Sequence, residues 1–333
     1  MNKCITSAPG KLVIAGEYAV LEGYPGIVTA VNKRAYVTSH SAPNWQIQSM
    51  NRGLVDLPHP APEFELINLV LSAAQNRYNF AHPKKLQIDS SALYHQTKDK
   101  ICKLGLGSSA AVTTSLAAQC LDGPFLDRDA IFSLSFEAHK AFTHQAGSGI
   151  DIAASCYGGL LSFQSSLENS LPTISALTLA INPNSIIGVF TRKAQDTRLF
   201  LKAVSQLKNQ DPREYRAIMK NLGEQALALR DPLCLKPDWS LLTTLTNEIS
   251  SSLQILGQKA KINIVTDKHR HLAQIAKEHG GAAKPSGAGG GDMALCFIPI
   301  EQKAQFLQDL APLDLEYLPL DFLALGVQAE NLT

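Results

Sequence analysis

Glycine placement is the sequence feature that most restricts the fold of this chain. Three glycine-bearing segments stand far apart: "APGKLVIAGEYAV" at 8–20, "KLGLGSSAA" at 103–111 and "KPSGAGGGD" at 284–292. Glycine loses more conformational entropy on folding than any other residue, so a plain surface turn gains nothing from a run such as "SGAGGG". A backbone that must wrap closely around a ligand does require it.

The middle segment runs into the alanine-rich stretch "SSAAVTTSLAAQCL", which predicts a helix of about 14 residues beginning at Ser108. The N-terminus of such a helix binds phosphate through its free N–H groups and the positive end of its dipole. The segment also fits G-x-G-x-x-A, from Gly105 to Ala110, but the preceding "YHQTKDKICK" is not a clear hydrophobic strand. An ordinary capped helix and a phosphate-binding loop both remain open here.

The other two segments add charged and hydroxyl side chains to backbone turns. Lys284 and Ser286 would offer a cation and a hydroxyl to a ligand, and the apolar strand "MALCFIP" follows directly. This favours a ligand-binding loop over a flexible surface loop. In the first segment Pro9 and Gly10 predict a turn, and Lys11 opens an apolar strand. A lysine there is either a surface residue with a buried stem or a fixed cation beside a site.

Composition excludes several classes of function. The 333 residues suit two domains, and 45% hydrophobic residues suffice for sizeable cores. A net charge of +1 gives no reason to expect nucleic acid or an anionic membrane as partner. No apolar run reaches transmembrane length and no signal peptide is evident, so we expect a cytoplasmic protein. The six cysteines form no CxxC pair, which favours reduced, buried thiols over disulfides or a zinc site.

Hydrophobic periodicity predicts a strand-rich first third, followed by helices and strands in alternation. Helices are expected at 63–79, after Asp127 as N-cap, across most of 196–257, and before Gly280 as the C-terminal glycine. A polar stretch separates two regions near residues 168–186. The predicted domains are therefore 1–180 and 181–333.

The three segments, in this order, resemble the motifs of the GHMP kinase superfamily, which includes galactokinase, homoserine kinase, mevalonate kinase and phosphomevalonate kinase. The resemblance covers essentially the whole chain. It implies an α+β, two-domain fold, with a ribosomal protein S5-like N-terminal domain and a ferredoxin-like C-terminal domain. It also implies a small-molecule phosphotransferase that uses ATP and Mg²⁺ in the cleft between them.

The resemblance also implies roles for individual residues. Lys11 and Asp151 match catalytic positions, with Lys11 neutralising charge and Asp151 acting as base or orienting its neighbours. Ser109 and Glu137 are the candidate metal ligands. The loop that binds the ATP phosphates consists of Gly105, Leu106, Gly107, Ser108, Ser109 and Ala110.

Finer details of the motifs resemble the phosphomevalonate kinase branch, where tyrosine follows the glutamate of "GEY" and aspartate ends "GAGGGD". One departure is "TRKAQDTRLF", which lacks that branch's usual glycine-lysine-proline-alanine-serine run. The candidate acceptor-binding residues are Tyr18, Lys103, His139, Ser148, Arg192, Ser286, Gly287, Ala288 and Gly289.

Several alternatives remain open. Mevalonate kinase differs in its acceptor, a non-catalytic homologue would bind ligand without turnover, and a dehydrogenase would bind a nicotinamide cofactor. The expected partner is a small molecule, with no nucleic acid and no membrane, and the chain is either a monomer or a homodimer.

Overall fold

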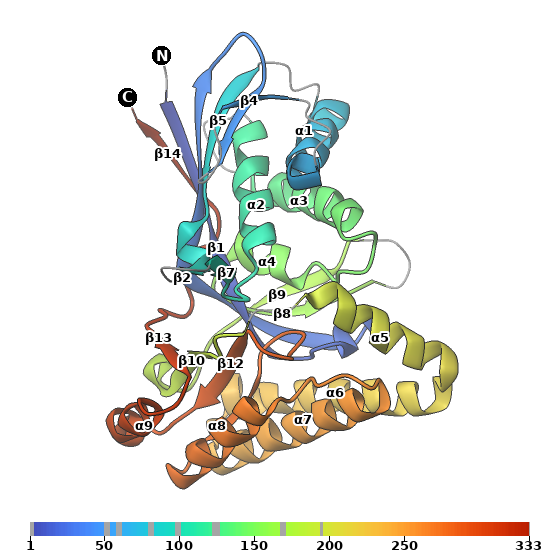
Figure 1. Ribbon diagram of the computed structural model, residues 1–333, viewed down its shortest axis with the longest axis vertical. Helices are drawn as coiled ribbons and strands as arrows, with labels where there is room; N and C mark the ends of the chain where they lie inside the picture. Colours follow the sequence, from blue (N-terminus) through green and yellow to red (C-terminus); the bar gives the residue numbers. More distant parts are fainter. Residues whose placement is uncertain are drawn as a thin grey trace.

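The backbone forms two β-sheets that follow one another along the long axis of the molecule, each with its own helices (Figure 1). The computed structural model describes residues 3–49, 54–57, 62–78, 83–96, 101–121, 127–166, 171–193 and 196–332. We call the larger sheet with helices α1 to α4 the first lobe, and the smaller sheet with helices α5 to α9 the second lobe.

The larger sheet has eight strands. Its main path is β14 (Gln328–Leu332), β1 (Lys3–Ala15), β2 (Pro25–Ser41), β5 (Lys84–Asp89), β3 (Gln46–Ser49) and β4 (Val55–Asp56). The long strand β2 also pairs with β8 (Leu160–Gln164), which in turn pairs with β9 (Thr173–Leu177). A separate hairpin, β6 (Tyr94–Gln96) and β7 (Ile101–Lys103), leads directly into the middle glycine segment.

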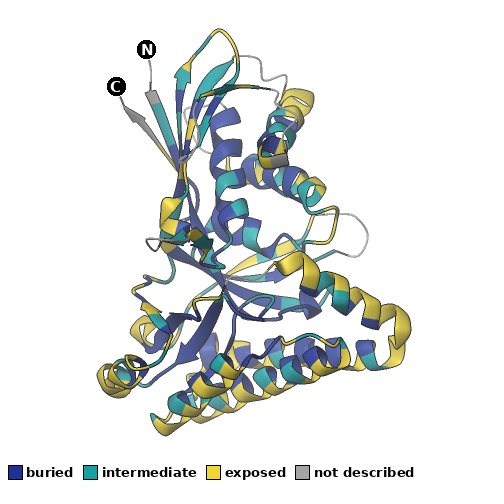
Figure 2. Cartoon of the chain, in the orientation of Figure 1, coloured by how far each residue is buried: buried dark blue, intermediate teal, exposed yellow. Residues whose placement is uncertain are grey.

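The helices of the first lobe are α1 (Glu65–Tyr78), α2 (Ser108–Cys120), α3 (Arg128–Phe142) and α4 (Ile150–Tyr157). Helix α2 is buried along almost its whole length (Figure 2), because its small alanine, serine and threonine side chains allow close packing. Several of its polar groups form hydrogen bonds inside the lobe; for example, the hydroxyl of Thr6 donates to Ser115 O at 2.7 Å. A helix held this firmly fixes the position of its own N-terminus.

The smaller sheet has the antiparallel order β11-β12-β10-β13. Its strands are β10 (Ile186–Phe190), β11 (Ala282–Pro285), β12 (Met293–Phe297) and β13 (Glu316–Leu318). Numbered along the chain, these strands lie in the order 4-1-3-2 when read from β13, which is the ferredoxin-like arrangement. The helices are α5 (Thr197–Gln210), α6 (Pro212–Arg230), α7 (Trp239–Lys259), α8 (Asp267–Glu278) and α9 (Lys303–Leu310).

One hydrophobic core joins the two lobes. It combines Leu12 and Ile14 of β1 with Phe190 of β10 and Leu253 of α7, all of which are buried. Helix α6 packs so closely against the first lobe that a Cβ added at Gly223 would lie 2.3 Å from the ring of Tyr24. Apolar packing therefore fixes how the lobes face each other.

The α+β class predicted from the sequence is confirmed, and most of the predicted helices form. Asp127 caps α3 by accepting from the N–H groups of Asp129 and Ala130, and Gly280 follows α8 in the left-handed conformation with φ 71°. The C-terminal strand β14 returns to the first sheet and pairs with β1, which the sequence pattern did not indicate. The division at residue 180 stays a prediction.

One local prediction was wrong. Pro9 and Gly10 do not form a turn but a register shift within the continuous strand β1. Within the ranges that the structure describes, no helix is both long and apolar enough to cross a bilayer.

Candidate active site

The three glycine segments meet at one place between the lobes. Two of them form loops, which we call the phosphate loop (residues 105–109) and the glycine-rich loop (residues 286–291). A Cβ added at Gly107 would lie 3.2 Å from Lys11 Cγ and Cε, and one added at Gly287 would lie 3.8 Å from Lys11 Nζ. The side chain of Lys11 therefore lies between a loop of the first lobe and a loop that follows β11 of the second.

The irregularity in β1 explains why Lys11 reaches this place. The pairing with β2 shifts register between Pro9 and Gly10, which alters the direction of the following residues. The backbone N–H of Lys11 then donates to Leu106 O at 2.9 Å, outside the β1–β2 ladder. A Cβ at Gly10 would lie 2.7 Å from the same oxygen, so only glycine permits this approach.

The phosphate loop ends at the N-terminus of α2, as predicted. Gly105 and Gly107 both have positive φ, 78° and 76°, and Gly107 is the N-cap. The ammonium group of Lys11 donates to Gly105 O at 3.4 Å. The first N–H groups of a helix have no partner within the helix, so those of Ser108, Ser109 and Ala110 are available to an anion.

Helix α4 brings a carboxylate to the same place. Its N-cap is Gly149, with φ 88°, and Asp151 lies in its first turn. A Cβ at Gly107 would lie 3.7 Å from Asp151 Cβ, so the predicted catalytic pair Lys11 and Asp151 flanks the phosphate loop. Ser148, three residues before Asp151, accepts from the N–H of Ile150 at 3.3 Å. Ser148 thus lies just before α4.

The side chains of Ser109 and His139 are in contact, whereas Glu137 contacts neither of them but pairs elsewhere. His139 is only 4% exposed, and its Nε2 lies 3.1 Å from Ser109 Oγ. Glu137 lies two positions earlier on α3, hence on another face, and forms an ion pair with Arg77 of α1 at 3.5 Å. This corrects the expected pairing of Ser109 and Glu137 as metal ligands.

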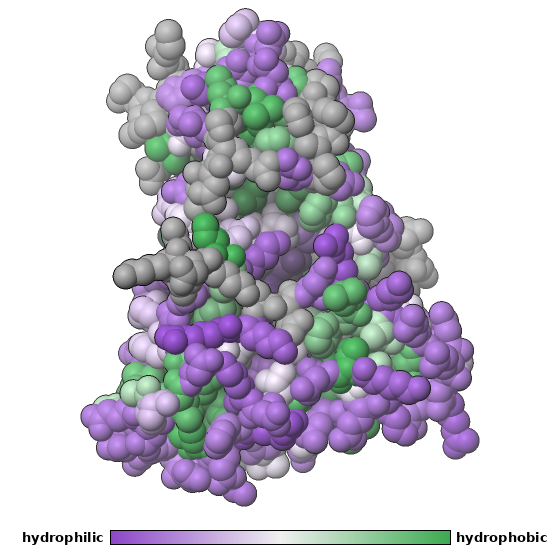
Figure 3. Space-filling view, in the orientation of Figure 1, coloured by the Kyte–Doolittle hydropathy of each residue, from purple (hydrophilic) through white to green (hydrophobic). Residues whose placement is uncertain are grey.

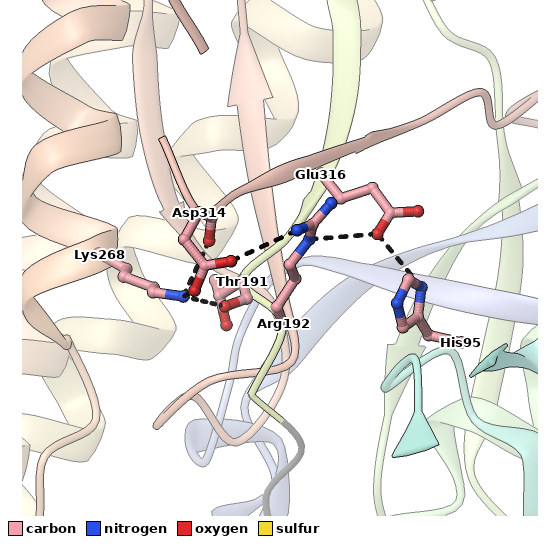
Figure 4. Close-up of polar contacts among 6 residues, drawn as sticks. All are labelled: His95, Thr191, Arg192, Lys268, Asp314 and Glu316. Carbon is pink, nitrogen blue, oxygen red and sulfur yellow. Dashed lines mark hydrogen bonds and ion pairs between the residues drawn. The ribbon is translucent and has the colours of Figure 1, made fainter. Parts of the chain in front are cut away.

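Arg192 is held by carboxylates of the second lobe (Figure 4). Its Nη1 lies 3.4 Å from Asp314 Oδ1, and its Nε lies 3.5 Å from Glu316 Oε2. Lys268 also pairs with Asp314, and His95 of the β6–β7 hairpin pairs with Glu316 at 3.2 Å. A role for Arg192 in holding the acceptor phosphate stays a prediction, and it would require these ion pairs to open.

The hairpin also carries Lys103, which is exposed at the end of β7. Its positive charge contributes to lowering the pKa of Asp196, after the larger effect of the hydrogen bond from Arg198. Asp196 is the N-cap of α5 in the second lobe. Gln195 belongs to "TRKAQDTRLF", the segment that departs from the phosphomevalonate kinase pattern, and it lies outside the described residues.

The glycine-rich loop presents backbone, not side chains, to the site. The hydroxyl of Ser286 donates to Val13 O at 2.8 Å and accepts from Val13 N at 3.0 Å, and Tyr18 OH donates to Ala288 O at 2.5 Å. Lys284 is completely buried. The expectation that Lys284 and Ser286 offer a cation and a hydroxyl to a ligand was wrong, because both side chains contact the first lobe.

Tight packing behind this loop explains its glycines. A Cβ at Gly289 would lie 2.6 Å from Ile264 O, and one at Gly290 would lie 2.2 Å from the ring of Phe200. A Cβ at Gly105, on the opposite loop, would lie 2.5 Å from Asp292 Cβ. The two loops are thus in contact. On the face drawn in Figure 3, the surface is hollowed at mid-height, and hydrophilic side chains lie around the hollow.

A comparison with protein families agrees with this arrangement. The model of the GHMP kinases N terminal domain matches residues 67–159, which include the phosphate loop, Ser109 and Asp151. Residues 67–159 therefore carry a GHMP kinase N-terminal domain.

Relatives of this chain carry two names. It is 25% identical to a mevalonate kinase of Thermococcus sibiricus, with 90% of each chain covered. It is 26% identical to a phosphomevalonate kinase of a Streptomyces species, with 89% of this chain and 90% of the relative covered. The solved structure of Streptococcus pneumoniae phosphomevalonate kinase with phosphomevalonate and AMPPNP has a TM-score of 0.82 at 21% identity. It covers 96% of this chain and 99% of that one, and at this identity it shows the shared fold.

Sequence reasoning missed two residues of this site. Gly10 is required by the close approach of Leu106 O, and Glu17 is buried against Lys284. A signal for Glu17 exists, because it is the one charged residue in the apolar run "LVIAGEYAVL". No comparable signal marks Gly10, since the contact joins segments about 100 residues apart.

The buried His269 behind the glycine-rich loop leads to a prediction on pH. Burial, and then the charge of Lys284, lower the pKa of His269 from 6.5 to about 4. As pH falls below 6.5 the unfolded chain takes up this proton first, so the unfolding free energy decreases until the pH reaches about 4. We expect a loss of about 2 kcal/mol between pH 7 and pH 5, measured by urea denaturation.

The variant His269→Gln should remove this contribution, because glutamine can keep the hydrogen bond to Thr266 N without titrating. His271→Gln, at an exposed position of the same helix, is the matched control and should retain it. An equal pH dependence in His269→Gln and the unmodified protein would contradict the prediction.

Proposed function

We propose that this protein transfers the γ-phosphoryl group of ATP to phosphomevalonate, giving ADP and diphosphomevalonate. The observation that carries the proposal is the position of Lys11, between the phosphate loop and the glycine-rich loop, with Asp151 also beside Gly107. Phosphoryl transfer depends mainly on positioning and on neutralising the charge of the phosphates. This arrangement supplies both.

The proposed roles follow from the geometry. The N–H groups of Ser108, Ser109 and Ala110 bind the ATP phosphates at the N-terminus of α2. Lys11 neutralises charge between the donor and acceptor phosphates. An acceptor phosphate is already largely ionised near neutral pH, so Asp151 orients Lys11 instead of removing a proton.

The residues beside the phosphate loop suit magnesium bound together with ATP. Mg²⁺ prefers oxygen ligands and is often held by one or two protein groups plus substrate phosphates. Ser109 and Asp151 are the residues that would hold it; within the described part of the chain, no three His, Cys, Asp or Glu side chains form a separate cation site. Bound magnesium would supply charge neutralisation at the phosphates. In the tautomer of His139 with Nε2 unprotonated, the hydroxyl of Ser109 would donate a hydrogen bond to Nε2, which would leave the hydroxyl lone pairs free for this contact.

Mevalonate is the alternative acceptor, because relatives of both names are similarly distant. With an alcohol as acceptor, Asp151 would be the general base. Tyr18 and the final Asp292 of "GAGGGD" favour phosphomevalonate, by the resemblance noted above.

An ADP-release assay with each acceptor in turn tests the proposal, with ³¹P NMR to identify a new diphosphate. We expect release with phosphomevalonate and a diphosphate product. Release with mevalonate alone would establish the alternative acceptor. ATP binding without release from either would indicate a non-catalytic homologue.

A further inference from the structure

Glu17 and Lys284 form an ion pair that is sealed from solvent and joins the two lobes. Their side chains are 1% and 0% exposed, and they come from positions 267 residues apart in the chain. The ammonium group of Lys284 donates to Glu17 Oε1 and, at 2.9 Å, to Pro285 O. The other carboxylate oxygen, Glu17 Oε2, has no hydrogen-bond partner among the described residues.

A buried ion pair contributes little net free energy to the stability of an interface. Removing two charges from water costs several kcal/mol per ion, and apolar residues of the same volume often serve stability equally well or better. The unpartnered Oε2 adds to this cost. An ion pair differs from apolar packing in one respect. It fixes the direction and the distance between two backbone segments.

The position of the pair shows which segments these are. Alternate residues of the segment that enters the glycine-rich loop contact the first lobe: Lys284 pairs with Glu17, Ser286 bonds to Val13, and Ala288 accepts from Tyr18. Lys284 and Ser286 are two positions apart at the end of β11, so their side chains lie on one side. The turn at Gly287, with φ 82°, then brings the backbone oxygen of Ala288 to Tyr18. Gly287, between the last two contacts, is the residue that faces Lys11.

Resting on the proposed function, we propose that Glu17 and Lys284 are positioning residues for phosphoryl transfer. Their ion pair holds the glycine-rich loop in register with β1 and thereby keeps Gly287 opposite Lys11. Neither residue touches a substrate. Loss of the pair lets residues 286–291 shift along β1, which misplaces the backbone around the transferring group.

The test separates positioning from stability. Each single variant, Glu17→Gln or Lys284→Met, leaves one buried group uncompensated and should lower the melting temperature. The double variant removes both charges, so its melting temperature should return to within a few degrees of the unmodified protein. We expect its kcat to remain at least 10-fold low, with amide hydrogen exchange at residues 286–291 at least 10-fold faster. Recovery of both kcat and slow exchange in the stable double variant would overturn the proposal.

Glu22→Gln is the matched control. Glu22 lies in the same turn region and also pairs with a lysine of the second lobe, Lys208, at 2.7 Å, but this contact is to α5 and is partly exposed. Its kcat and loop exchange should match those of the unmodified protein.

Glu17→Asp covers the case in which the double variant fails to fold. It keeps the charge but withdraws the carboxylate by one methylene, so we expect kcat to fall while the melting temperature changes little. Unchanged kcat would contradict the positioning role. If the unmodified protein turns over neither acceptor, the proposed function fails, and the exchange of residues 286–291 still decides whether the pair holds the loop.

Discussion

Replacing Lys11 with methionine is expected to lower kcat by about 10²- to 10³-fold, the usual effect of removing one group that stabilises transition-state charge. The ammonium group lies beside both loops, 3.4 Å from Gly105 O, so its charge falls where the phosphates of donor and acceptor would meet. Methionine keeps the length and the apolar stem of lysine but not its charge. Steady-state kinetics with saturating ATP and acceptor measure the effect.

Folding should be almost unaffected by this change. Lys11 is only partly buried, and its single side-chain hydrogen bond is long, so the unfolding free energy should change by less than about 1 kcal/mol. Lys220→Met is the control, because that lysine is 65% exposed on α6. A kcat within about threefold of the unmodified protein would remove Lys11 from the catalytic residues.

The sequence predicted the parts of the fold that depend on local patterns. The α2 helix, the Asp127 cap and the buried strand after residue 292 follow from periodicity and capping chemistry, and all three are present. The return of β14 to β1 could not be predicted in this way, because it joins the two ends of the chain and depends on long-range packing.

The same distinction between local patterns and long-range packing applies to the site. Glycine spacing indicated both loops, and the structure brings them together around Lys11. The direction of each side chain was not predictable from spacing. Lys284 looked like a cation for a ligand, yet it lies at a strand position that faces the other lobe, where Glu17 compensates its charge. Glu137 was a candidate metal ligand because it is a carboxylate of the helix that follows α2, but its side chain pairs with Arg77.

Substituting alanine for Gly105 is expected to reduce kcat/KM for ATP by about 100-fold or more, since a displacement near 1 Å in a catalytic site has effects of that size. Two unfavourable effects of the substitution combine at this position, one on the backbone conformation and one steric. The φ of 78° is unfavourable for any residue with a Cβ, and the new Cβ would lie 2.5 Å from Asp292 Cβ and 2.9 Å from its Cγ. Because the Asp292 backbone is itself bonded to Thr191 and Lys193, the phosphate loop must move instead.

Gly159→Ala separates the effect of backbone conformation from the steric effect. Gly159 also has a left-handed φ, 67°, but a Cβ there would meet no atom within 4 Å. This control should lose about 1 kcal/mol of unfolding free energy and keep its kcat/KM. Gly105→Ala should lose a comparable or larger amount of stability and also its affinity for ATP, which isothermal titration calorimetry with a non-hydrolysable ATP analogue can measure. If both variants bind the analogue as the unmodified protein does, contact between Gly105 and Asp292 does not shape the phosphate loop. The glycine would then serve backbone conformation alone.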